Sequence, residues 1–221
     1  MMAQLVMEGV CYRDPGTKKD VLSGVDAVFP AGKVTAIIGR SGTGKSTTMY
    51  LLAGLDTPCS GRILYNGQEL HRSTLDQYRR SEVATIAQNY LLFPTRTALE
   101  NVLYPLQLKK TPPAEALAQA KRCLSAVDIP EELYDRLPSR LSGGEQQRVA
   151  IARALASNAN VITADEPTGN LDEENAEAVM ALLCDLAHKE GKTVILVTHD
   201  SAVADAADTV LRLKGGKLQI V

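Results

Sequence analysis

The chain has 221 residues, 45% of them hydrophobic, with a formal net charge of -2 and a pI of about 6.0. These values predict a globular protein with a substantial core and exclude a surface that is basic throughout, so we expect no nucleic-acid partner. No stretch approaches the run of about 18 apolar residues that a membrane span requires, and no basic segment followed by an apolar run marks a secretory signal.

The first part of the chain is rich in β-branched residues and predicts strands. The expected strands lie at 21–29, 34–38, 61–65 and 83–87. The segment 89–156 instead has helical periodicity interrupted by prolines. The helices expected there lie at 97–108, 114–127 and 145–156. Strand and helix then alternate again. The elements expected there are a strand at 161–164, a helix at 173–189, a strand at 193–197 and a hairpin turn at 214–217.

This order of elements predicts the α/β class. We expect a single domain, 1–221, whose α/β core consists of 1–88 and 157–221. The helical segment 89–156 would be an insert that interrupts this core.

A glycine-rich loop between the strand at 34–38 and a helix expected at 46–53 is the strongest motif of the chain. It fits the phosphate-binding pattern G-x-x-x-x-G-K-[ST] at every fixed position. Glycines let the backbone approach phosphate oxygens, and the open helix N-terminus favours negative charge. Lys45 can reach the β- and γ-phosphates, and the Ser46 hydroxyl can bind Mg²⁺. The nucleotide-binding residues expected here are Gly39, Arg40, Ser41, Gly42, Thr43, Gly44, Lys45, Ser46 and Thr47.

Two adjacent carboxylates follow the apolar strand at 161–164. A parallel strand places its C-terminal end at the ligand edge of the sheet, beside the glycine-rich loop. Asp165 can then hold Mg²⁺, and Glu166 can orient the water that attacks the γ-phosphate. The pair therefore predicts the second element of a nucleotide-hydrolysing site.

The run Leu141-Ser142-Gly143-Gly144-Glu145-Gln146-Gln147-Arg148 predicts the start of a helix. Ser142 and Glu145 have the spacing of a capping box, and the two glycines leave amides open to an anion. A capped helix alone would not require the paired glycines. Together with the two motifs above, this run resembles the ATP-binding cassette (ABC) family, and the resemblance extends along the whole chain in order.

The resemblance implies an ATPase with a P-loop NTPase (RecA-like) core, an N-terminal antiparallel β-subdomain and an inserted α-helical subdomain. In that family the signature run of one subunit binds the γ-phosphate of the ATP held by the other subunit. The residues implied to act in trans, across a homodimer that holds two ATP·Mg²⁺, are Ser142, Gly143, Gly144 and Glu145.

Four further positions match functional residues of the family. Tyr12 stands where the family places an aromatic that stacks on adenine, and the alternative is a half-buried strand residue. Gln88 matches the glutamine that reaches toward the metal and the attacking water. Asp172, in Asn170-Leu171-Asp172, matches the loop that crosses the dimer interface and also fits a helix N-cap. His199 matches the histidine that contacts the γ-phosphate. The catalytic set thus implied is Lys45, Gln88, Glu166 and His199, and the Mg²⁺ ligands are Ser46, Gln88 and Asp165.

The runs 165–172 and 97–102 are similar to one branch of the family, which serves lipoprotein release, macrolide export, antimicrobial-peptide resistance and cell division. This similarity implies, as partner, an integral membrane permease with few spans and a large extracytoplasmic domain. The protein would be cytoplasmic and peripheral on the inner face of the cell membrane, in keeping with four cysteines that form no C-x-x-C pair. The apolar segment 90–94 would either receive a short permease helix or belong to the core of the insert.

Other functions share parts of this pattern. An ATP-driven regulatory switch on a membrane partner, such as a cell-wall enzyme or a sensor kinase, would need the same catalytic residues and would move no cargo. A soluble ABC ATPase of DNA repair or translation would need a long coiled coil or a second cassette, for which we find no sign in the sequence. A nucleotide kinase would not require the run 141–147.

Overall fold

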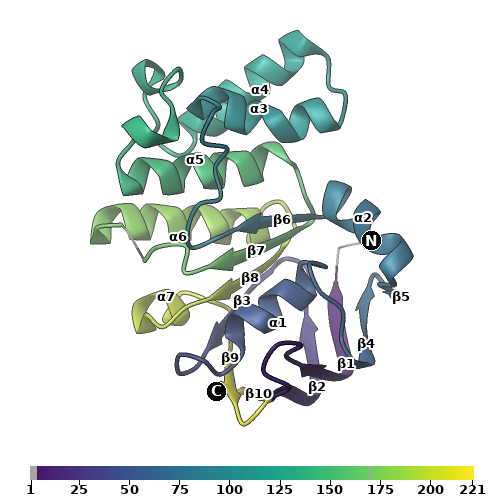
Figure 1. The fold of residues 1–221 in the computed structure, drawn as a ribbon. Helices are drawn as coiled ribbons and strands as arrows, with labels where there is room; N and C mark the ends of the chain where they lie inside the picture. Colours follow the sequence, from purple (N-terminus) through teal and green to yellow (C-terminus); the bar gives the residue numbers. More distant parts are fainter. Residues whose placement is uncertain (1–3, 170) are drawn as a thin grey trace.

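Two β-sheets organise the molecule, in the strand orders β2-β1-β4-β5 and β10-β9-β3-β8-β7-β6 (Figure 1). The structure is a computed structural model that describes residues 4–169 and 171–221. The first sheet is antiparallel and contains β1 (Leu5–Arg13), β2 (Asp20–Phe29), β4 (Ser60–Tyr65) and β5 (Gln68–Glu69). The second contains the parallel strands β3 (Lys33–Ile38), β6 (Val83–Ile86), β7 (Val161–Asp165), β8 (Thr193–Val197) and β9 (Thr209–Lys214), with β10 (Lys217–Ile220) antiparallel to β9.

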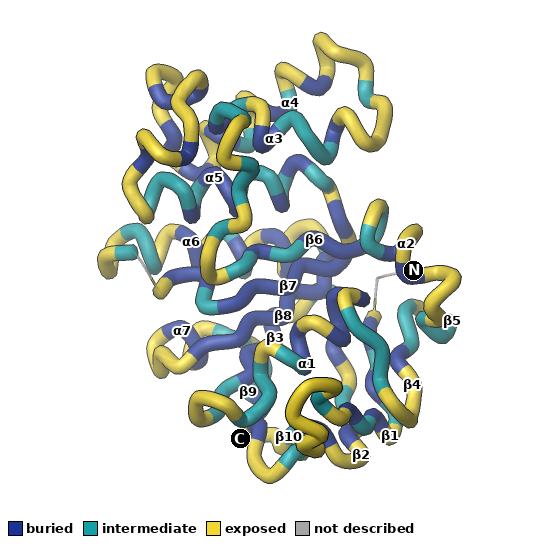
Figure 2. The backbone as a smooth tube through the Cα atoms, in the orientation of Figure 1, coloured by how far each residue is buried: buried dark blue, intermediate teal, exposed yellow. Residues whose placement is uncertain are grey.

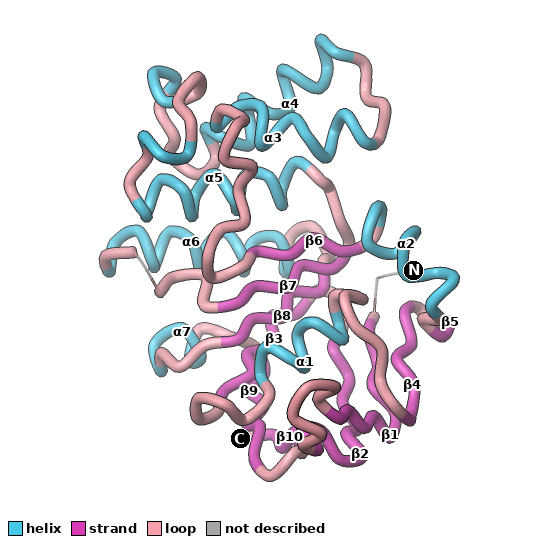
Figure 3. The backbone as a smooth tube through the Cα atoms, in the orientation of Figure 1, coloured by secondary structure: helices cyan, strands magenta, loops and turns pink. Residues whose placement is uncertain are grey.

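The helices divide between the sheets and a helical region beyond the β6 edge, as Figure 3 shows. The helices of the core are α1 (Lys45–Leu52), α2 (Arg72–Ser81), α6 (Glu173–His188) and α7 (Ser201–Asp205). The helical region contains α3 (Ala98–Leu108), α4 (Pro113–Ser125) and α5 (Gly143–Ala156), with short 3₁₀ turns at Glu131–Leu133 and Pro138–Arg140. Among the described residues, no helix combines the length and the apolar character needed to cross a membrane.

The central strands β7 and β8 of the six-stranded sheet are buried along their whole length (Figure 2), and the sheet separates two cores. On one face, Ile37 and Ile195 pack with α1 and the antiparallel sheet. On the other, Ile162 and Val194 pack with α5 and α6. Thr163 interrupts the apolar run of β7 and is fully buried, but its hydroxyl pairs with that of Thr85 at 3.0 Å. This two-sided burial holds the C-terminal strand ends in fixed positions.

The α/β fold predicted from the sequence is confirmed, and each predicted element lies within two residues of an observed one. Two helices were not predicted. α2 is strongly polar and buries only Leu75 and Tyr78, so its apolar periodicity is too weak to detect. α7 has only five residues and is capped by Asp200, whose side chain accepts a hydrogen bond from the Ala202 amide.

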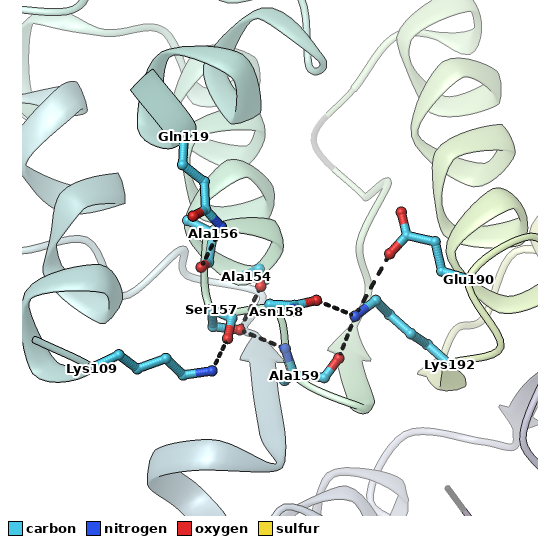
Figure 4. Close-up of polar contacts among 9 residues, drawn as sticks. All are labelled: Lys109, Gln119, Ala154, Ala156, Ser157, Asn158, Ala159, Glu190 and Lys192. Atoms are coloured by element: carbon cyan, nitrogen blue, oxygen red, sulfur yellow. Dashed lines mark hydrogen bonds and ion pairs between the residues drawn. The ribbon is translucent and has the colours of Figure 1, made fainter. Parts of the chain in front are cut away.

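Two lysines hold the junction where α5 ends and the chain enters β7 (Figure 4). Lys192 Nζ donates to Asn158 Oδ1 at 3.0 Å and to the Ala159 carbonyl at 2.8 Å. Its side chain is 8% exposed, and this burial lowers the pKa of the ammonium group. Lys109 Nζ donates to the Ser157 carbonyl at 2.5 Å. These donors pair with oxygens of the short segment that links α5 to β7.

Replacing Lys192 by Met is expected to lower the free energy of unfolding by about 1–3 kcal/mol, because the Ala159 carbonyl would lose its donor in a buried hydrogen bond. Urea denaturation measures this change. Lys189→Met is the matched control, since Lys189 forms an exposed pair with Asp185 and its loss should cost less than about 0.5 kcal/mol. Equal losses in the two variants would contradict the role of Lys192.

Candidate functional site

The glycine-rich loop connects β3 to α1 at the C-terminal edge of the six-stranded sheet. Gly42 and Gly44 have positive φ angles of 74° and 104°, which other residues rarely adopt. A Cβ atom on Gly44 would also overlap with Cγ1 of Val21. No side chain caps the first turn of α1, and no acidic residue lies in it. The backbone amides at the start of α1 are therefore open to an anion.

Replacing Gly44 by Ala is expected to weaken ATP binding more strongly than replacing Gly42 by Ala. Both substitutions strain the backbone by about 1–2 kcal/mol. Only the Gly44 variant also displaces Val21, because the space around Gly42 is open. Titration of both variants with ATP, alongside their urea denaturation, measures the difference. If the two variants lost the same affinity, the contact with Val21 would have no importance for the loop.

A cavity of about 550 Å³ opens beside this loop. Most of the phosphate-loop, catalytic and metal-binding residues expected in the core line this cavity together, although they come from distant parts of the chain. The predicted residues that line it are Gly39, Ser41, Gly42, Gly44, Lys45, Ser46, Thr47, Gln88, Asp165, Glu166 and His199. Arg40 and Thr43 instead line an adjoining cavity, which also contacts His199.

The ammonium group of Lys45 lies across its own loop. Its Nζ donates to the Gly39 carbonyl at 2.8 Å and to the Arg40 carbonyl at 3.3 Å. An arriving phosphate would offer this cation stronger, charged acceptors. Lys45 can therefore exchange loop carbonyls for phosphate oxygens without a change in the fold.

Asp165 ends β7 and is 8% exposed. Burial raises the pKa of its carboxyl and the neighbouring Glu166 raises it further, whereas a hydrogen bond with Ser46 and the charge of Lys45 lower it. A bound cation would stabilise the ionised form of this carboxyl. The oxygens of Ser46, Asp165 and Gln88 are the hard ligands that Mg²⁺ prefers. These residues fit a magnesium site shared with phosphate oxygens.

Glu166 is held in a strained conformation at the end of β7. Its φ angle is 48°, an unusual value for a residue with a side chain. Its amide donates to the Val197 carbonyl at 2.9 Å, which fixes the backbone. Its carboxylate, 12% exposed, lies 2.8 Å from Nδ1 of His199 and accepts from Thr198 Oγ1 at 3.3 Å. Strain of this kind is characteristic of functional residues.

The pair with Glu166 raises the pKa of His199. We expect the imidazole to titrate above its ordinary value of about 6.5. The pairing of the protonated imidazole with Glu166 then contributes fully to stability below about pH 6.5. This contribution to stability is lost as the pH rises through the raised pKa of His199. NMR titration of the imidazole measures the midpoint, and Glu166→Gln should lower it. Identical midpoints in the wild type and in this variant would contradict the pairing.

Gln88 is exposed and lines the cavity just after β6. Tyr90 and Leu91 follow it with φ angles of 61° and 46°. Arg153, from α5, donates to the carbonyls of both, at 3.0 and 2.7 Å. The segment that carries Gln88 is therefore attached directly to the helical region.

Tyr12 is not brought into this cavity. Its ring is 8% exposed within the core between the antiparallel sheet and α1, and its hydroxyl donates to Asp56 Oδ2 at 2.5 Å. This hydrogen bond and burial raise the pKa of the phenol to about 12. Tyr12 thus packs in the core without nucleotide, in keeping with the alternative interpretation as a strand residue. Its role as the adenine-stacking aromatic stays a prediction.

The signature run begins α5 as its capping box predicted. Ser142 Oγ accepts from the Glu145 amide, and the Glu145 carboxylate accepts from the Ser142 amide at 2.6 Å. Ser142, Gly143, Gly144 and Glu145 do not line the nucleotide cavity of their own chain. The resemblance assigns them to the nucleotide held by a second copy, so their position outside this cavity does not conflict with that assignment.

Two contacts attach α5 to the segment that follows Glu166. Gln147 Nε2 donates to the Pro167 carbonyl at 2.9 Å, and Arg148 donates to Asn175 Oδ1 at 2.7 Å. Asp172 is the N-cap of α6, as predicted, and accepts from the amide of Asn175 at 2.9 Å. Asn170, which belongs to the same predicted loop, lies outside the described residues.

Sequence reasoning missed five residues that line the cavity. One is Val197 at the end of β8, and the other four come from the β1–β2 region, namely Asp14, Thr17, Lys19 and Val21. The run Asp14-Pro15-Gly16 does signal a turn between two strands. Nothing local to it predicts that the turn would lie against a loop more than twenty residues away in the sequence. Only the packing of β2 against α1 and β9 brings them together.

Comparison with known proteins agrees with this geometry. A family model described as ABC transporter matches residues 22–169. The dimeric structure of MJ0796, a bacterial ABC transporter cassette, is 36% identical, with a TM-score of 0.91 over 97% of this chain and 96% of that one. MJ0796 in a post-hydrolysis state bound to ADP and Pi is 35% identical, with the same coverage and TM-score. CbiO1 of Clostridium perfringens, part of the ABC transporter complex CbiONQ, is 30% identical, with a TM-score of 0.85 over 97% of this chain and 86% of that one.

The fold and the phosphate loop define an α/β ATPase of the P-loop class. The family match covers more than half of the chain, and the MJ0796 structures align over nearly all of it. The chain therefore belongs to the ABC transporter family, as the sequence motifs indicated.

Proposed function

We propose that this ATPase is the nucleotide-binding subunit of a membrane transporter, and that two copies close around two ATP·Mg²⁺ to drive a permease. The observation that carries the proposal is the separation of the two half-sites. The phosphate loop lines a cavity that the residues of the signature run do not reach within the same chain. A second copy can complete the site, and MJ0796 is known as a dimeric cassette.

The proposed roles follow from the contacts of each side chain. Lys45 and the loop amides neutralise phosphate charge, while Ser46, Asp165 and Gln88 hold Mg²⁺, which would screen the charge that develops on the phosphates. Glu166 orients the attacking water and His199 contacts both this carboxylate and the γ-phosphate. From the second copy, Ser142, Gly143, Gly144 and Glu145 bind the γ-phosphate, and Asp172 lies at the dimer interface.

We also propose the division of the chain that the sequence suggested, with 1–88 and 157–221 as the nucleotide-binding core and 89–156 as the signature subdomain. The permease would dock where the two meet. A cavity of about 260 Å³ lies there, lined among others by Arg80, Tyr104 and Leu108. Leu108 and the nearby Leu91 are 59% and 61% exposed, which suits an apolar partner.

The proposed partner is a permease with few membrane spans and a large extracytoplasmic domain, which would place the subunit on the inner face of the cell membrane. CbiO1 is likewise part of a transporter complex. Similarity of the runs 97–102 and 165–172 to the lipoprotein-release and macrolide-export branch supports this choice of permease. Export, lipoprotein extraction and mechanical transmission are all compatible with it.

Light scattering of the Glu166→Gln variant tests the closure. We expect a monomer without nucleotide and a dimer with ATP·Mg²⁺, because ATP would be bound but not consumed. Adding Lys45→Ala or Ser142→Arg to the same protein should abolish the dimer. A dimer that persists with Ser142→Arg would contradict a signature run acting in trans. Co-purification of this chain with an integral membrane protein from solubilised membranes then tests the permease.

A further inference from the structure

The turn that contains Gln88 continues into a strained segment. The Tyr90 amide donates to the Ala87 carbonyl at 2.9 Å, which closes a turn around Gln88. The Leu91 amide donates to the Asn89 carbonyl at 2.7 Å. Tyr90 and Leu91 have φ angles of 61° and 46°, and two consecutive left-handed residues with side chains persist only where their surroundings hold them. Because the turn joins Gln88 to Tyr90, a displacement of one is passed to the other.

Helix α5 holds this segment in place. Arg153 donates to the carbonyls of Tyr90 and Leu91 at 3.0 and 2.7 Å. Its guanidinium carbon also lies 5.9 Å from the centroid of the Phe93 ring. The loop that leaves β6 thus passes along α5 on its way to α3 (Figure 3). Since α5 begins with the signature run, the strained segment and the signature run share one helix.

The side chain of Tyr90 extends along α5 as far as the signature run. A Cβ atom on Gly143 would lie 3.1 Å from the Tyr90 hydroxyl oxygen, closer than such atoms normally approach. A Cβ atom on Gly144 would instead lie 3.3 Å from Cδ2 of Leu171, just before α6. The paired glycines, which a capped helix alone does not require, therefore have different neighbours. Gly143 makes room for the segment that follows Gln88, and Gly144 makes room for the loop before α6.

We propose that Tyr90 is a positioning residue for the signature run, because its ring connects the Gln88 turn of a chain to Gly143 of the same chain. This inference rests on the proposed function, in which Gln88 binds Mg²⁺ in the chain's own cavity and Gly143 binds the γ-phosphate held by the second copy. Occupation of a chain's own cavity then adjusts, through Tyr90, the half-site that the chain offers to its partner. The two ATP molecules are thereby coupled within one polypeptide as well as across the interface.

Dimer formation in the Glu166→Gln background tests the contact between Tyr90 and Gly143. We expect Gly143→Ala to raise the ATP concentration for half-maximal dimerisation by about tenfold or more, because its methyl group meets the Tyr90 hydroxyl. Adding Tyr90→Phe removes that oxygen and should restore the value of the parent variant to within about threefold. Gly144→Ala is the matched control. Its methyl group meets Leu171 instead, so Tyr90→Phe should not rescue it.

Tyr90→Ala distinguishes positioning from a general loss of structure. ATP binding by the chain's own cavity, titrated with Ser142→Arg present to prevent the dimer, should stay within about twofold of the value without Tyr90→Ala. In the Glu166→Gln background, Tyr90→Ala should nevertheless raise the ATP concentration for half-maximal dimerisation by about tenfold. Tyr90→Phe keeps the ring and should leave both quantities within about threefold.

Three results would overturn the role of Tyr90. Tyr90→Phe could rescue Gly144→Ala as fully as Gly143→Ala, it could rescue neither, or Tyr90→Ala could dimerise at the same ATP concentration as its parent. In each of these cases, an ATP-dependent dimer of the Glu166→Gln variant alone would leave the proposed function intact. If Glu166→Gln bound ATP but never dimerised, the proposed closure of two copies would fail together with this inference.

Discussion

The Glu166→Gln variant is expected to hydrolyse ATP about 10²- to 10⁴-fold more slowly than the wild type, with little change in ATP affinity. The amide keeps the volume of the side chain and can still contact Thr198 and His199, but it cannot take a proton from water. Because the backbone at Glu166 is fixed by the Val197 carbonyl, the substitution should not move the strand end. Steady-state kinetics and ATP titration measure the two quantities separately.

His199→Ala provides the comparison for this result. It removes a contact of the glutamate at 2.8 Å but leaves the carboxylate in place. We expect a turnover between those of the wild type and of Glu166→Gln, because Glu166 would still orient the water but would have lost its contact with His199. Turnover by Glu166→Gln within tenfold of the wild type would remove Glu166 from its proposed role.

The parts of the site that could be predicted from sequence are those formed by local interactions. The phosphate loop, the capping box of Ser142 with Glu145, and the N-cap at Asp172 each depend on residues within one turn of chain. Such patterns keep their geometry in almost any surrounding fold. The strand that ends at Asp165 was predicted for a similar reason, since its apolar run implies burial.

What could not be predicted depends on contacts between distant segments. Tyr12 could face either the core or a ligand, and only the packing of β1 against α1, with Asp56 as partner for the hydroxyl, places its ring in the core without nucleotide. The position of Asp14 beside the phosphate loop likewise depends on how β2 packs. The strained backbone of Glu166 is held by a hydrogen bond to β8, which a single sequence does not reveal.

Asp165→Asn is expected to stabilise the protein in the absence of nucleotide while abolishing Mg²⁺-dependent ATP hydrolysis. Burial raises the pKa of Asp165 above that of the unfolded chain, so the folded state binds more protons between the two values. Stability therefore falls as the pH rises through this interval, and the penalty persists at neutral pH. Asparagine carries no charge and can still accept the hydrogen bond from Ser46. We expect a gain of about 1 kcal/mol, or roughly 2–4 °C in Tm.

Thermal unfolding with and without MgATP measures the stability of each variant and the stabilisation that it gains from the bound nucleotide. The wild type should gain stability from MgATP, because the bound cation compensates the buried carboxylate, whereas Asp165→Asn should gain much less. Asp185→Asn is the matched control, since Asp185 is exposed and pairs with Lys189 on the surface of α6. If Asp165→Asn were less stable than the wild type at neutral pH, Ser46 and Lys45 would already compensate the negative charge of the buried Asp165 carboxylate. An uncompensated negative charge on Asp165 would then not be what favours the binding of Mg²⁺.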